Sequence, residues 1–128
     1  MTHLFSISYD LHNPNDNENI SNDDVRELII CLLVKEKCEP IKRYTATTIH
    51  FTSSNTFKFF VKLFEKHLSV YVTATIEKII KTNEGLPRFQ LLNRNKEIEN
   101  NFDNEILEIQ NMDSEKLESR ILELSLNF

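Results

Sequence analysis

The sequence predicts an α+β fold in which four strands and two amphipathic helices follow one another in the order βαββαβ, before an acidic helical extension. Three observations lead to this prediction. Two segments repeat apolar residues at helical spacing, and the segments between them are rich in β-branched and aromatic residues. The chain has 128 residues, of which 40% are hydrophobic and nine are Phe. That is enough for one folded domain with a modest core.

The first strand and the first helix have the clearest local signals. Residues 3–10 alternate apolar with small or polar side chains and predict a buried strand, which ends at Asp10 before a polar loop over 12–22. Ser21 and Asp24 have the spacing of a helix capping box. The helix predicted over 22–36 has an apolar face made of Val25, Leu28, Ile29, Leu32 and Leu33.

The middle of the chain predicts two short strands, a helix and a further strand. Residues 41–52 follow Pro40 and form the strand pair, with a turn near Thr45–Thr47. The helix covers 54–68, with Ser53, Ser54 and Asn55 as candidate caps. Val70–Ile76 is the clearest strand. This order is the ferredoxin-like pattern, an antiparallel sheet with both helices packed on one face.

The predicted organisation has three parts: a ferredoxin-like domain over 1–80, a linker over 81–95 that contains Gly85, and an acidic helical tail over 96–128. Two amphipathic helices are expected in the tail. Their apolar stripes must be covered by the domain, by a second subunit or by a partner. The stripes consist of Ile98, Phe102, Ile106 and Ile109, and of Leu117, Ile121, Leu124 and Phe128.

The composition excludes several classes of function. A single Gly in the whole chain excludes glycine-rich phosphate loops and dinucleotide fingerprints. No apolar run is long enough to cross a membrane and no secretory signal is visible, so we expect a cytoplasmic protein that does not act at a membrane. Cys31 and Cys38 have a spacing that allows a disulfide, but two reduced thiols are the expected state in that compartment.

Charge is strongly segregated along the chain. The formal net charge is −5, yet residues 35–96 carry +7 while 1–34 carry −5 and 97–128 carry −7. An acidic protein is an unusual nucleic-acid binder, but a basic middle weakens that objection. The plain alternative is a set of solvated charged faces.

Asp10 is the main candidate for chemistry, because a carboxylate at the end of a strand is fixed in direction and stays exposed. It is a candidate divalent-metal ligand, for Mg²⁺ or Mn²⁺, or a general base for phosphodiester cleavage. The alternative is a loop-capping Asp. One carboxylate is too few for a hard cation, but a symmetric dimer supplies a second Asp10. His12, two residues after Asp10, is close enough in sequence to assist its chemistry. The alternative is that His12 is a solvated loop residue.

The candidate nucleic-acid-binding residues are basic. Lys42 and Arg43 lie beside Tyr44 in the predicted strand pair, where His50 is expected to face outward. Lys58, Lys62 and Lys66 follow at intervals of four residues and form one stripe along a helix. Such a stripe neutralises phosphates without reading base sequence, and its alternative is an ordinary solvated helix face.

The segment Ile7-Ser8-Tyr9-Asp10-Leu11, at the end of the first strand, resembles the first-strand motif of a group of small ferredoxin-fold proteins. That group includes the CRISPR adaptation subunit that partners the integrase and the virulence-associated D ribonucleases. The resemblance covers residues 3–78. Asp10 is the one residue of this chain that it matches to a functional residue of the family. It implies a homodimer whose paired first-strand aspartates bind a divalent metal for RNA or DNA cleavage in some members and are inert in others.

Two segments depart from the adaptation subunit. The first predicted helix offers one Arg, in Val25-Arg26-Glu27, instead of an arginine-rich start. The segment from Tyr44 to Ile49 replaces the Ser-Val-Phe-Glu-Gly of the second strand.

The sequence therefore favours a dimeric nucleic-acid-handling protein that acts as a metal-dependent endoribonuclease through paired Asp10. The alternative is a non-catalytic protein-interaction module or regulator that uses the acidic helical tail.

Overall fold

The computed structural model describes residues 2–12, 21–68, 72–80, 84–85 and 95–126. Its eight elements confirm an α+β fold. The full order is βαββαβαα, so two helices follow the six-element βαββαβ pattern. The elements are β1 (His3–Leu11), α1 (Asn22–Lys35), β2 (Ile41–Thr45), β3 (Thr48–Ser53), α2 (Phe57–His67), β4 (Val72–Ile79), α3 (Lys96–Gln110) and α4 (Ser114–Leu126).

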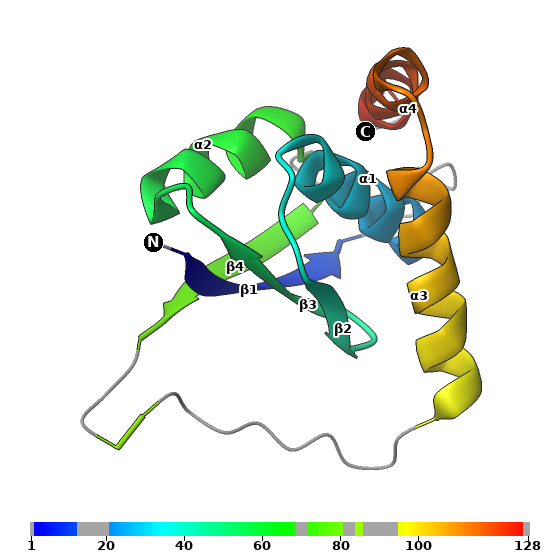
Figure 1. Cartoon of the computed structure of the whole chain (residues 1–128). Coiled ribbons are helices and arrows are strands. Elements are labelled where there is room, and N and C mark those ends of the chain that lie inside the picture. The colour runs from blue at the N-terminus through cyan, green and yellow to red at the C-terminus, as the bar shows by residue number, and fades with distance from the viewer. Residues whose placement is uncertain (1, 13–20, 69–71, 81–83, 86–94, 127–128) are drawn as a thin grey trace.

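The four strands form one antiparallel sheet in the order β2-β3-β1-β4 (Figure 1). β1 lies in the centre and pairs with β3 on one side and with β4 on the other. β2 and β3 are joined by a tight turn at Ala46 and Thr47, as the sequence predicts. β2 and β4 are therefore the two edge strands.

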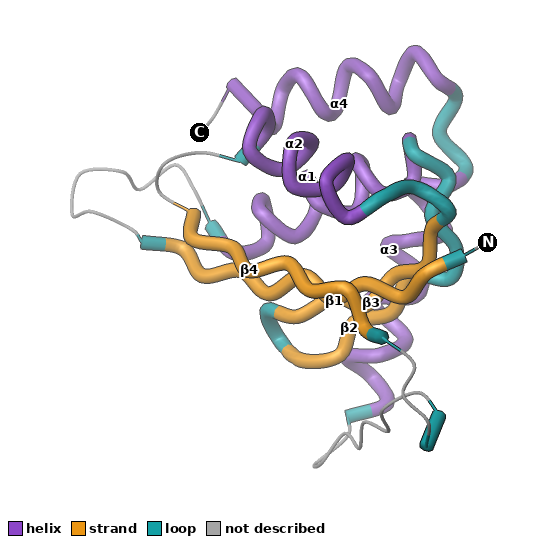
Figure 2. The backbone as a smooth tube through the Cα atoms, turned by 90° about the vertical axis from the view of Figure 1, so that its left-hand side faces the viewer, coloured by secondary structure: helices purple, strands orange, loops and turns teal. Residues whose placement is uncertain are grey.

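The helices α1 and α2 lie on one side of the sheet, and α4 lies on the far side of α1 (Figure 2). α3 runs past the β2 edge (Figure 1). The sheet packs against these helices through its alternate residues, because successive strand side chains point to opposite faces. Those residues include Phe5, Ile7, Tyr9, Ile49 and Phe51, all fully or almost fully buried.

α1 is buried on more than one side. The predicted apolar face, from Val25 to Leu33, is buried, and so are Ile30 and Cys31, which point elsewhere on the helix. The reason is that α3 and α4 pack against α1, so it needs apolar side chains toward the sheet and toward the C-terminal helices. One hydrophobic cluster consequently includes residues of the sheet, of α1 and of both acidic helices.

Side chains cap the start of each helix. Ser21 and Asp24 form the predicted capping box, with both hydrogen bonds at 3.2 Å. α2 begins later than predicted, because the Thr56 hydroxyl accepts from the backbone N–H of Phe59 at 3.1 Å and acts as the N-cap. The Asn95 side chain caps α3 in the same way.

Two details of the prediction change. β4 extends three residues beyond Ile76, and Val70 lies outside the described residues. Ile98 was expected in an apolar stripe, but its side chain is 47% exposed because the first turn of α3 lies before the part that contacts the core. Phe128 and the linker residues 81–83 and 86–94 also lie outside the described residues.

Because Leu124 of α4 is 1% exposed and shares the core cluster, we predict that Leu124→Ala destabilises the whole protein. The expected loss is about 2–5 kcal/mol, the usual cost of removing a buried leucine side chain. Urea unfolding followed by circular dichroism should show one transition at a lower midpoint. Leu122→Ala is the matched control, since Leu122 is 62% exposed on the same helix. A separate α4 transition, with the main midpoint unchanged, would contradict this prediction.

Candidate functional site

The sheet has a second face, away from α1 and α2 (Figure 2). The strand register places mostly polar side chains on it. We call it the open face. Its residues alternate with the buried ones along each strand and line up across the sheet through the strand register. They are Leu4, Ser6, Ser8 and Asp10 of β1, Lys42 and Tyr44 of β2, Thr48, His50 and Thr52 of β3, and Thr73, Thr75, Glu77 and Ile79 of β4.

The open face contains a stacked pair of aromatic rings. The ring centroids of Tyr44 and His50 are 4.2 Å apart, and the ring planes differ by only 4°. Lys42 and Ser6 are the cross-strand neighbours of His50 on either side. Burial lowers the pKa of His50 below its ordinary value, so the ring is neutral at pH 7. The two rings face one another, so each covers one face of the other, and Lys42 brings an ammonium group beside them.

Hydroxyl groups surround this ring pair. Ser8 and Thr48 lie opposite one another and hydrogen-bond through their side chains at 2.9 Å. Thr75 lies opposite Ser8 on its other side. Serine and threonine hydroxyls both donate and accept, so this region can bond to phosphates, sugars or bases.

Asp10 lies at the end of β1, on the open face, and is exposed. Its cross-strand neighbour is Thr73, whose hydroxyl hydrogen-bonds to the ring of His12. Among the described residues Asp10 makes no hydrogen bond or ion pair, and residues 13–20 of the loop that it was expected to cap lie outside them, so the loop-cap alternative stays open. Within the described part of the chain, the carboxylate of Asp10 is available to a ligand.

A metal held by Asp10 needs further ligands. In the described part of the chain no three His, Cys, Asp or Glu side chains are placed to hold a metal ion together. Hard divalent cations prefer several oxygen ligands. The donors that one copy offers in its described residues therefore do not complete a site, and a paired site requires a second chain.

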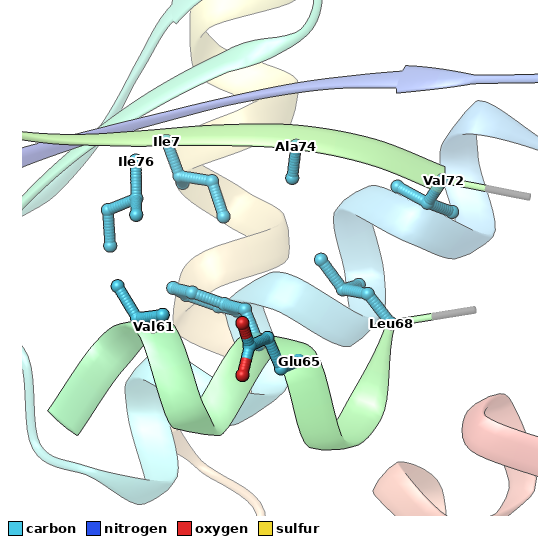
Figure 3. Close-up of a pocket in the computed structure, with 8 residues that line it drawn as sticks. Ile7, Val61, Glu65, Leu68, Val72, Ala74 and Ile76 are labelled. Atoms are coloured by element: carbon cyan, nitrogen blue, oxygen red, sulfur yellow. The ribbon is translucent and has the colours of Figure 1, made fainter. Parts of the chain in front are cut away.

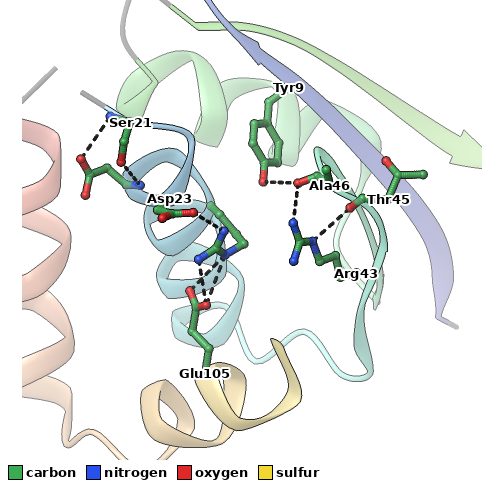
Figure 4. Close-up of polar contacts among 9 residues, drawn as sticks. Tyr9, Ser21, Asp23, Arg43, Thr45, Ala46 and Glu105 are labelled. Atoms are coloured by element: carbon green, nitrogen blue, oxygen red, sulfur yellow. Dashed lines mark hydrogen bonds and ion pairs between the residues drawn. The ribbon is translucent and has the colours of Figure 1, made fainter. Parts of the chain in front are cut away.

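The structure separates the five basic residues that the sequence grouped. Only Lys42 lies on the open face. Arg43 points to the helix side, where its guanidinium donates to the carbonyl oxygens of Thr45 and Ala46 at 3.2 Å (Figure 4). Lys58, Lys62 and Lys66 are exposed on α2, which lies on the opposite side of the sheet from Lys42.

Ion pairs attach the acidic helices to α1. Arg26 contacts Asp23 at 2.7 Å and Glu105 of α3 at 3.2 Å (Figure 4). Lys35 contacts Glu118 of α4 at 2.8 Å. A further pair joins Glu27 to Arg120 of α4. The single Arg at the start of α1 is therefore engaged in holding α3.

Sequence reasoning identified Tyr44 and the outward direction of His50, but not their contact. Cross-strand register decides that contact, and a bulge in β2 between Arg43 and Thr45 changes the register locally. In the sequence, the alternation of residue types along 41–52 was the only indication that Tyr44 and His50 share a face. The grouping of the serine and threonine hydroxyls also depends on strand order, which local sequence patterns do not specify.

Cys31 and Cys38 are both free thiols inside the core. Burial raises the pKa of Cys31 to about 12 and that of Cys38 to about 11. The thiolate is the reactive form, so neither group is a nucleophile at neutral pH. The structure places both away from the open face, in the hydrophobic cluster.

We predict that a chromogenic disulfide reagent modifies neither cysteine in the native protein at pH 7.5. Both should react rapidly in urea, because unfolding exposes the thiols and restores their ordinary pKa. The measurement is the release of the coloured thiol product over time, with and without denaturant. Fast modification of the folded protein would show that this part of the core opens readily.

The comparisons with known proteins give no family for this chain: it matches no protein-family model, no curated protein and no solved structure.

Proposed function

We propose that the chain is a ferredoxin-like module that binds single-stranded nucleic acid across the open face of its sheet. The ferredoxin-like assignment is supported by the order of the first six elements, by the antiparallel pairing and by the strand order β2-β3-β1-β4. In the described part of the chain, none of the helices packs on the open face (Figure 2).

The stacked Tyr44–His50 pair is the observation that carries the proposal. Single-stranded RNA and DNA are bound largely by stacking bases on aromatic side chains, and four-stranded sheets with aromatic residues in neighbouring strands serve as such platforms. Here the rings come from the neighbouring strands β2 and β3. Lys42 beside them offers a phosphate contact, and the hydroxyls offer polar contacts to sugars and bases.

Electrostatics play a small part in this mode of binding. Lys42 is joined on the open face by the acidic residues Asp10 and Glu77. Affinity for a single strand falls with salt in proportion to the phosphates neutralised, with a logarithmic slope of about −0.7 for each. The open-face mode therefore implies a shallow salt dependence, whereas the lysine stripe on α2 implies a steep one.

We predict that Tyr44→Ala weakens binding to a fluorescent single-stranded oligonucleotide by about ten- to hundredfold, since stacking contributes roughly 1–3 kcal/mol per base. Fluorescence anisotropy gives the dissociation constant, and circular dichroism checks the fold. The matched control replaces Lys58, Lys62 and Lys66 together with Ala and should retain nearly full affinity. The reverse result, with loss in the lysine variant only, would assign binding to α2 and refute the open-face mode.

A second candidate function, metal-dependent cleavage of RNA, follows from the exposure of Asp10 on the same face. A bound Mg²⁺ or Mn²⁺ would polarise a phosphodiester or lower the pKa of a water molecule. Asp10 would hold the ion, together with a carboxylate of a second chain in a homodimer. Strand β1 brings this carboxylate to the side of the sheet that carries the ring pair.

For this second function, we predict cleavage of a labelled RNA that requires Mg²⁺ or Mn²⁺ and disappears in Asp10→Ala while oligonucleotide binding is retained. Gel electrophoresis of the products gives the rate. Asp103→Ala, a change at an exposed position of α3, is the control carboxylate. Cleavage that persists at the wild-type rate in Asp10→Ala would remove Asp10 from the mechanism.

The alternative function, a protein-interaction module in residues 96–128, stays a prediction. Apart from the exposed Ile98, the described residues of the apolar stripes of α3 and α4 are buried in the core, so they are not available to a partner. The outward surface is acidic and includes the exposed Leu107 and Leu122. A partner of this surface would have to recognise mainly charge.

A further inference from the structure

β4 is an edge strand with the features of a pairing surface. It lies at the end of the sheet and, among the described strands, hydrogen-bonds only to β1. An edge strand leaves half of its backbone N–H and C=O groups without sheet partners. Natural edges are usually protected by Pro, by bulges or by several charges. β4 is eight residues long, contains no Pro, and has charges only at Glu77 and Lys78.

An apolar groove runs along the helix side of this edge. It lies between α2 and β4 and has a volume of about 330 Å³ (Figure 3). Val61 of α2 and Leu68, the residue after α2, line one wall, and Val72, Ala74 and Ile76 of β4 line the other. Ala74 is exposed although it faces the helix layer, because nothing in the described residues covers this part of the strand.

We propose that this edge and groove bind a second copy of the chain, with the two β4 strands antiparallel about a two-fold axis at Thr75. The proposal does not depend on the nucleic-acid function. In this register Ala74 lies opposite Ile76 of the second copy, and Thr75 lies opposite its own equivalent. The two sheets join into one of eight strands, and α2 of each copy lies on the same side.

Charge complementarity favours a second copy as the occupant. The register places Glu77 opposite Thr73 and Lys78 opposite Val72, so no like charges face each other in the joined strands. Lys78 of the second copy then lies at the Val72 end of the groove, beside Leu68 at the end of α2 (Figure 3). Glu65, one turn earlier on α2, is the carboxylate that lines the groove and can pair with this ammonium group.

The same geometry has a consequence for Asp10. Neighbouring strands are about 4.8 Å apart and each residue advances about 3.4 Å. The two Asp10 residues are separated by three strand spacings and four residue steps, or roughly 20 Å. They cannot share a metal ion in this dimer. The β4 interface and the paired-Asp10 metal site therefore exclude each other, and an experiment on the interface distinguishes them.

Cross-linking of Thr75→Cys is the sharpest test of the register. Directly opposite residues have Cβ atoms about 4.5–5.5 Å apart, close to disulfide range, whereas the two copies of Thr73 are about 14 Å apart. Under mild oxidation we expect covalent dimer from Thr75→Cys and none from Thr73→Cys. The native Cys31 and Cys38 are buried and add little background. Equal cross-linking of the two variants would refute the register.

Sedimentation equilibrium of the full chain tests the interface itself. The wild type should show twice the monomer mass, and Ala74→Lys should show the monomer mass, because it places a charge in the centre of the apolar groove. Thr45→Lys, an exposed position on the other edge strand, should remain dimeric. A wild type that stays monomeric, or an Ala74→Lys variant that dimerises as well as the wild type, would overturn the proposal. The cross-linking and sedimentation results do not affect the anisotropy measurement. Failure of the β4 dimer can therefore be distinguished from failure of nucleic-acid binding on the open face.

Discussion

The burial of α1 between the sheet and the two acidic helices is the constraint on which the rest of the structure depends. Leu28, Ile29 and Leu32 are almost completely buried, and so are Ile30 and Cys31 on another side of the helix. A helix that is apolar on several sides is stable only when each side is covered. α3 and α4 cover α1, and ion pairs such as Arg26–Glu105 fix their position. In the described part of the chain, all helical packing lies on one face or at the β2 edge of the sheet, and none covers the open face.

This arrangement separates most of the acidic residues from the open face, for which we propose nucleic-acid binding. Negative charge is concentrated in residues 97–128, and these helices lie on the far side of α1 and beyond the β2 edge (Figures 1 and 2). Two of their carboxylates, those of Glu105 and Glu118, are paired with basic residues of α1. The open face carries hydroxyls, two stacked rings, Lys42 and the acidic residues Asp10 and Glu77. The binding mode that we propose for it relies on stacking and hydrogen bonding more than on net charge.

Local patterns predicted the elements well, because each element has a signal within a few residues. The capping box at Ser21 and Asp24 and the turn at Ala46 and Thr47 are examples. What was missed depends on contacts between distant segments. Ile98 fits the apolar period of α3, yet it is exposed because the core does not extend to the first turn. The sequence predicted one group of basic nucleic-acid-binding residues. In the structure, Lys42 on a strand and Lys62 on a helix lie on opposite sides of the sheet.

The sequence by itself determined the α+β class, the alternation that divides each strand into two faces, and the exposure of Asp10 at the end of the first strand. These features depend on neighbours in the chain, for which periodicity and turn chemistry are sufficient. Tertiary structure alone decided that Tyr44 stacks on His50, that α3 and α4 complete the burial of α1, and that β4 forms an edge beside an apolar groove. Strand order and register decide such contacts, and they depend on the packing of the whole chain.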